Sequence, residues 1–146
     1  MYDAIQIVHS YWAYLVVLVV TLAAINAIIG FFGKKEYRPK DFRISLFALI
    51  VTHLQLLIAI ILFFVSPKVM WFADGVGMSE IMKDPVLRLY NVEHPFIMIA
   101  VTALITIGYS KHKKKLTSTP KFKILTIFYA LAWILMLSRI PWAEWL

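Results

Sequence analysis

The sequence contains no cysteine among its 146 residues, and charged residues make up only 16% of it. Without cysteine there can be no disulfide, no thiolate-held metal or iron–sulfur cluster, and no cysteine nucleophile. Hydrophobic residues make up 62% of the chain, so polar residues are too few to cover a water-soluble domain of this size. The composition therefore indicates an integral membrane protein, in which histidine and methionine remain as the main soft metal ligands.

Four apolar runs are long enough to cross a bilayer, which takes about 20 helical residues. The first run has no basic segment before it and is too long for a signal peptide, so we expect it to be retained as a span. Gly33 ends the first helix, and Ser66-Pro67 ends the second. Asp84-Pro85 and Thr119-Pro120 each offer a capping side chain followed by proline, which is typical of a helix start. We expect helices over about 4–32, 41–65, 85–110 and 120–140.

These helices fill the chain and predict one all-α membrane domain, residues 1–146, built as a transmembrane four-helix up-down bundle. Eleven of the fifteen basic residues fall in or beside the loops after the first and third helices. The positive-inside rule places those loops in the cytoplasm, with both termini on the outer, periplasmic side of a bacterial inner membrane. The net charge of +7 is then mostly an orientation signal, so we expect the lipid bilayer and no nucleic acid as a partner. The segment 111–115 (KHKKK) is interpreted as a short charge run whose lysines act as a topology signal and could also contact anionic lipid.

Ionisable side chains in the predicted spans are the candidates for function, because charged types cost about 2.5 to 3.5 kcal/mol at a helix centre. They are His9, His53, Glu93, His94 and Arg139. Two neutral imidazoles on facing helices are a usual way to hold a haem b iron inside a membrane bundle. Histidines in three separate helices therefore predict a haem site with His9, His53 and His94 as candidate iron ligands.

Depth along the helices leaves two ligand pairs open. The first and third helices are diagonal neighbours in an up-down bundle, which favours His9 with His94, while His53 with His94 stays possible by depth. Arg139 is predicted to bind a haem propionate, or else to pair with Glu93 or reach the interface. Pro95 is expected to bend the third helix beside His94. Glu93 or Gln55 is expected to orient an imidazole.

Two other interpretations are open. The chain could be a non-redox accessory or structural subunit of a larger inner-membrane complex, in which the histidines and Arg139 make hydrogen bonds between helices. It could also handle copper or protons, using the histidines with the thioethers of Met70, Met78 and Met82. Packing of these methionines at the interface is the simpler reading.

The chain resembles a family of small four-span bacterial membrane proteins described as cytochrome b-like. The resemblance covers nearly the full length and rests on segments 46–56 (LFALIVTHLQL), 82–90 (MKDPVLRLY), 92–95 (VEHP), 107–110 (IGYS) and 138–142 (SRIPW). It implies a membrane haem protein with His9, His53, His94 and Arg139 as the matching polar positions. We therefore expect a haem b protein that transfers single electrons, as an electron carrier or subunit rather than a stand-alone enzyme. Its expected redox partners are other inner-membrane subunits, of respiratory or secretion type, or a quinone.

Overall fold

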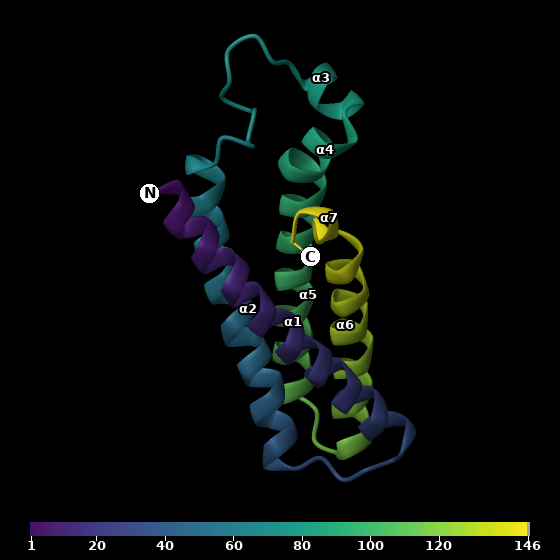
Figure 1. The fold of residues 1–146 in the computed structure, drawn as a ribbon. Helices are drawn as coiled ribbons and strands as arrows, with labels where there is room; N and C mark the ends of the chain where they lie inside the picture. Colours follow the sequence, from purple (N-terminus) through teal and green to yellow (C-terminus); the bar gives the residue numbers. More distant parts are fainter. Residues whose placement is uncertain (146) are drawn as a thin grey trace.

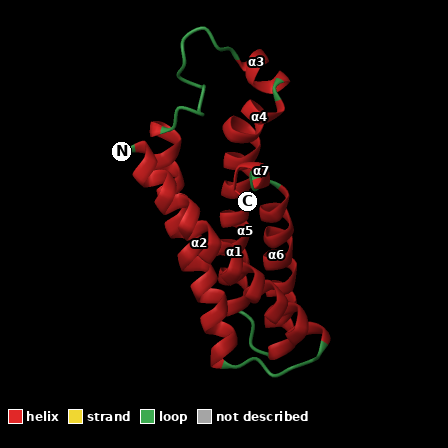
Figure 2. Ribbon diagram, viewed as in Figure 1, coloured by secondary structure: helices red, strands yellow, loops and turns green. Residues whose placement is uncertain are grey.

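The computed structural model describes residues 1–145, and that part of the chain is helical without any strand (Figure 2). Four regions are long and apolar enough to cross a membrane: Tyr2–Phe32, Pro39–Val65, Pro85–Lys113 and Ser118–Ser138. The predicted all-α class with four spans is therefore confirmed. The helices are α1 (Tyr2–Phe32), α2 (Pro39–Val65), α3 (Met78–Lys83), α4 (Pro85–Arg88), the π-helix η1 (Leu89–Glu93), α5 (His94–Lys113), α6 (Ser118–Ser138) and α7 (Trp142–Trp145).

The four long helices form an up-down bundle. Helix α1 packs against α2 and α6, and α5 packs against the same two helices, so α1 and α5 lie on a diagonal. Figure 1 shows the loops 33–38 and 114–117 together at one end, which we name the basic end after its lysine and arginine residues. The N-terminus, the long loop 66–77 and α7 lie toward the other end, named here the terminal end. The orientation of these ends in a membrane stays a prediction.

The helix ends follow local sequence signals with one exception. Asp84 accepts hydrogen bonds from the amides of Val86 and Leu87 at 2.9 and 3.2 Å, so its predicted capping role is confirmed. The prediction that Thr119 opens the last helix is wrong, because α6 begins at Ser118. The Ser118 hydroxyl instead accepts from the backbone N–H of Tyr37 at 2.8 Å and joins the two loops of the basic end.

Small and β-branched residues form the core, which lets the helices approach closely. Ala23, Ala24 and Ala27 of α1 are buried, as are Ala48 of α2 and Ala132 of α6. Burial is concentrated in the basic half of the bundle. The first buried residue of α1 is Val16, and the last of α2 is Thr52. The helical segments 2–15 and 53–65 therefore surround the least densely packed part of the bundle.

Hydrogen bonds donated by aromatic side chains join the helices. Without these bonds the indole N–H and phenol O–H groups would have no partner in lipid. The Trp12 indole donates to the carbonyl of Val51 at 2.9 Å, joining α1 to α2. The Trp133 indole donates to the hydroxyl of Thr21 at 2.9 Å, joining α6 to α1. Tyr129 is fully buried and donates to the carbonyl of Ser45 at 2.8 Å, across the other diagonal.

Candidate cofactor site

The structure brings together two of the three predicted histidine ligands. His9 of α1 and His94 of α5 lie in the terminal half, with ring centroids 6.3 Å apart and ring planes at 74°. Both side chains are half-buried. They meet across the diagonal of the bundle, where only long side chains from opposite helices can reach each other.

Each of these imidazoles is oriented through its Nδ1 atom. His94 Nδ1 donates to the carbonyl of Arg139 at 2.8 Å, which puts its proton on Nδ1 and leaves the Nε2 lone pair available. Gln55 Nε2 lies 3.2 Å from His9 Nδ1 and donates to the carbonyl of His9 at 3.0 Å. Of the two residues expected to orient an imidazole, Gln55 does so. Glu93 instead binds two arginines.

The backbone before His94 forms a π-turn. The His94 amide donates to the carbonyl of Leu89, five residues earlier, and closes η1. Pro95 has no N–H, so the carbonyl of Asn91 lacks its usual helical donor. The indole of Trp71, from loop 66–77, donates to that carbonyl at 2.8 Å. The backbone at Pro95 thus contains a π-turn that the long loop completes, and the bend expected beside His94 stays a prediction.

The side chain of Asn91 holds the same loop. This residue is fully buried. It accepts from the amide of Met70 at 2.6 Å and donates to the carbonyls of Lys68 and Leu87 at 3.2 and 2.8 Å. Every polar atom of the amide therefore has a partner, and the loop is fixed one turn away from His94.

An ion network lies beside His94. Glu93 accepts from Arg88 Nε at 2.7 Å and lies 3.3 Å from Arg139 Nε. Of the roles considered for Arg139, pairing with Glu93 is the one that the structure contains. Two arginines share one carboxylate, so the network keeps one uncompensated positive charge next to the histidine pair.

His53 lies apart from that pair. Its side chain is exposed on α2, and its Nδ1 donates to the carbonyl of Leu49 at 2.8 Å, in its own helix. Its Nε2 is 3.3 Å from the hydroxyl of Thr106 on α5. Thr106 follows His94 by twelve residues, which corresponds to about 18 Å along a helix. The His53 with His94 pair is therefore not brought together in this structure.

The segment 111–115 also contains a residue that sequence reasoning missed. The segment was interpreted only as a charge run, but His112 within it is fully buried, while its lysines are exposed. Tyr37 donates its hydroxyl to His112 Nε2 at 2.8 Å, and His112 Nδ1 donates to the carbonyl of Tyr109. Burial raises the pKa of the Tyr37 hydroxyl to about 12. The signal was the helical spacing of Ile105, Gly108 and His112, which share one buried face of α5.

The donor set can be compared with what a haem iron needs. Across residues 1–145, no three or more histidine, aspartate or glutamate side chains gather to hold a metal ion. A haem iron takes only two protein ligands, because the macrocycle supplies the other nitrogens. Two cavities, of about 320 and 350 Å³, lie elsewhere, and neither is lined by His9 or His94. The pair instead lies in the terminal half of the bundle, where segments 2–15 and 53–65 bury no residue.

Comparison of the chain with known protein families, with curated proteins and with solved structures finds no match. The plain conclusion from the fold is a multi-pass helical protein suited to a lipid bilayer.

Proposed function

We propose that this chain is a membrane haem b protein that transfers single electrons, with His9 and His94 as the two axial ligands. The observation that carries the proposal is the 6.3 Å separation of the two ring centroids. A metal–imidazole bond is about 2.0 to 2.1 Å long. Two imidazoles that bind one metal from opposite sides therefore have centroids about 6 Å apart. The observed separation of the two ring centroids is compatible with both rings holding one metal ion, which supports the proposal.

The surrounding residues would each have a defined task. The Arg139 carbonyl holds the His94 proton on Nδ1, so that Nε2 can bind iron. At His9, Nε2 binds iron if Nδ1 carries the proton, which a Gln55 amide oxygen can accept after the amide turns over. Gln55 Oε1 is buried without a hydrogen-bond partner. The rotation gives that oxygen the His9 Nδ1 proton as a partner and gives up the bond from Gln55 Nε2 to the His9 carbonyl.

The excess positive charge of the Arg88, Glu93 and Arg139 network suits one haem propionate in a charge-assisted hydrogen bond. When bound, haem supplies reversible one-electron chemistry at its iron. The chain itself would set the potential by ligation, burial and this nearby charge. We further propose a bacterial inner-membrane location with the basic end in the cytoplasm, and a quinone or another inner-membrane subunit as the electron partner.

The test is a reduced-minus-oxidised visible spectrum of the full chain, purified in detergent after expression with added haem. We expect the spectrum of a six-coordinate haem with two histidine ligands and about one haem per chain. His9→Ala and His94→Ala should each lose this spectrum. His53→Ala is the matched control, a span histidine outside the pair, and should keep it. Absence of bound haem in the folded wild type, or equal loss in all three variants, would overturn the proposal.

The loosely packed terminal half of α2 favours one alternative, a non-redox accessory subunit of a larger inner-membrane complex. Segment 53–65 buries no residue within the chain, and another subunit could cover it. This function predicts that substitution of Leu57, which is 60% exposed there, by tryptophan weakens co-purification of the complex and leaves the visible spectrum unchanged. A changed spectrum with intact co-purification would instead favour the haem site.

A further inference from the structure

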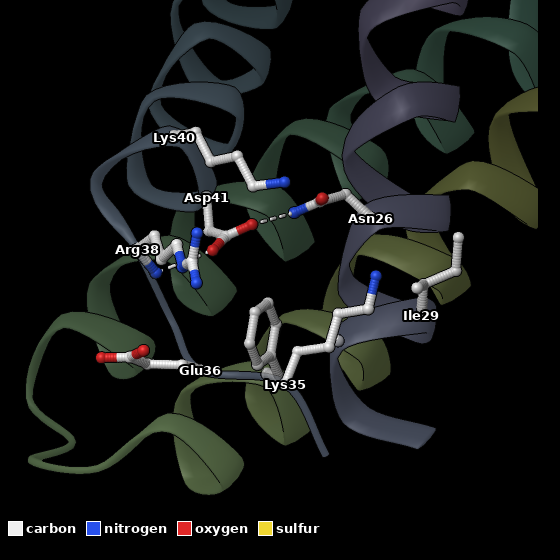
Figure 3. Close-up of a pocket in the computed structure, with 9 residues that line it drawn as sticks. Asn26, Ile29, Lys35, Glu36, Arg38, Lys40 and Asp41 are labelled. Atoms are coloured by element: carbon white, nitrogen blue, oxygen red, sulfur yellow. Dashed lines mark hydrogen bonds between the residues drawn. The ribbon is translucent and has the colours of Figure 1, made fainter. Parts of the chain in front are cut away.

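A second candidate site lies at the basic end, far along the bundle from the histidine pair. A cavity of about 320 Å³ opens there between the last turns of α1, the loop 33–38 and the first turn of α2 (Figure 3). A volume near 300 Å³ is at the lower end of the range for small-ligand sites. Its lining residues are Asn26, Ile29, Gly30, Lys35, Glu36, Arg38, Lys40, Asp41 and Phe122.

The floor of the cavity is a buried and fully satisfied carboxylate. Asp41 is only 3% exposed. Its Oδ1 accepts from the side-chain amide of Asn26 at 2.8 Å, and its Oδ2 accepts from the backbone N–H of Arg38 at 2.7 Å. Both oxygens are thus used to fix the start of α2 against α1. This rigid support positions the cationic side chains around the cavity.

Three cations of the cavity lack an anionic partner. Lys35, Arg38 and Lys40 form no ion pair with any residue in the range 1–145. In Figure 3, Lys35 and Lys40 extend toward the face of α1 that carries Asn26, and the Glu36 carboxylate points away from them. The lining also carries the carboxylates of Glu36 and Asp41, so three cations against two anions leave a net charge of +1 around the hollow.

The remaining wall is apolar and marks the edge of a span. Ile29 is 47% exposed on the outer surface of α1. Gly30 lies against the buried ring of Phe122, which a side chain at that position would displace, since an added Cβ would be 2.3 Å from a ring carbon. An anion held by the three cations would thus lie at the level where the apolar span ends. The exposed Ile29 beside it would contact the hydrocarbon of the bilayer.

We propose that this cavity binds a phosphate group, supplied by an anionic phospholipid of the surrounding leaflet. Arginine and lysine are the usual phosphate partners, and Lys35, Arg38 and Lys40 form no ion pair within residues 1–145. The lipid source follows from the position, because the exposed Ile29 continues the apolar surface along which an acyl chain would run. Soluble phosphate esters share the chemistry and are separated from lipid by the experiment.

The experiment measures binding of phosphatidylglycerol to the full chain in phosphatidylcholine nanodiscs, with a fluorescent phosphatidylglycerol displaced by unlabelled lipid. The site variant is Lys35→Gln/Arg38→Gln/Lys40→Gln. The control variant, Lys114→Gln/Lys115→Gln/Lys123→Gln, removes the same charge from exposed lysines at the same end. Circular dichroism and thermal unfolding in neutral lipid check that both variants fold. A parallel arm adds glycerol 3-phosphate or inorganic phosphate.

We expect the site variant to bind phosphatidylglycerol at least tenfold more weakly, because it removes the three cations that line the cavity. The control variant should bind within about twofold of wild type, because its lysines lie outside the cavity lining. If soluble phosphate alone binds with the same variant dependence, the phosphate site stands and its lipid source is wrong. Equal loss in both variants shows general surface attraction and overturns the site. Equal binding by wild type and site variant overturns it as well.

Discussion

Replacing Asn91 by alanine tests the link between the long loop and the π-turn before His94. Asn91 is fully buried, and its side chain makes three hydrogen bonds, to Met70, Lys68 and Leu87. A single hydrogen bond contributes about 0.5 to 1.5 kcal/mol net. The three bonds together predict a loss of about 3 kcal/mol in the free energy of unfolding. The loss is increased when the amide of Met70 stays buried without a partner.

The assay is unfolding of the detergent-solubilised chain by increasing sodium dodecyl sulfate, followed by circular dichroism. Trp71→Phe is the comparison, because it removes a single bond, to the carbonyl of Asn91, and should cost about 0.5 to 1.5 kcal/mol. Asn91→Asp keeps the acceptor for Met70 but turns a carboxyl oxygen toward the carbonyls of Lys68 and Leu87, so it should cost at least as much as Asn91→Ala. Limited proteolysis should cut loop 66–77 faster in Asn91→Ala. If Asn91→Ala costs no more than Trp71→Phe, the three-bond account of this loop is refuted.

Three further predictions use contacts of the bundle. Gly30→Ala should lower the free energy of unfolding by about 1 to 3 kcal/mol, because overpacking against Phe122 outweighs the gain in helix propensity. Phe122→Leu in the same chain should recover part of the loss. If the two substitutions have additive effects in unfolding assays, the clash is contradicted. Tyr37→Phe should cost about 1 to 3 kcal/mol by leaving buried His112 without its donor. Since burial raises the pKa of Tyr37 to about 12 from 10.0, the stability it adds is complete below pH 10 and is lost as the pH rises through about 12. Unfolding of wild type and Tyr37→Phe from pH 8 to 12 checks this, and a constant difference would refute it. Trp133→Phe should cost about 0.6 kcal/mol through the lost bond to Thr21, and no change in thermal unfolding would mean that lipid or water replaces it.

The spans were predictable because the bilayer imposes a length and an apolar composition on each helix. Local chemistry also identified the cap at Asp84 and the end at Gly33, where the backbone N–H bonds to the carbonyls of Ile29 and Phe31. The diagonal relation of α1 and α5 followed from the expected up-down topology, and with it the approach of His9 to His94. These features depend on contacts near in sequence or on one strong solvent constraint.

Features that depend on distant partners were not predictable in the same way. His112 lies between lysines, and only its contact with Tyr37, 75 residues earlier, satisfies its Nε2 inside the bundle. Several partners were possible for Arg139 from the sequence. In the structure it pairs with Glu93, because the π-turn places that carboxylate between Arg88 and Arg139. The cavity at Lys35, Arg38 and Lys40 likewise exists because Asp41 bonds to Asn26 across two helices.

Pro95 shows how such a distant contact can reach the candidate site. Its missing N–H frees the carbonyl of Asn91, a cost that its own helix cannot offset. The indole of Trp71 supplies the donor from loop 66–77, twenty residues earlier in the chain. The loop therefore stabilises the π-turn. The π-turn in turn positions the backbone from which the His94 side chain extends. A partner that displaces the loop at the terminal end would thereby change the geometry of the His9 and His94 pair without touching either imidazole.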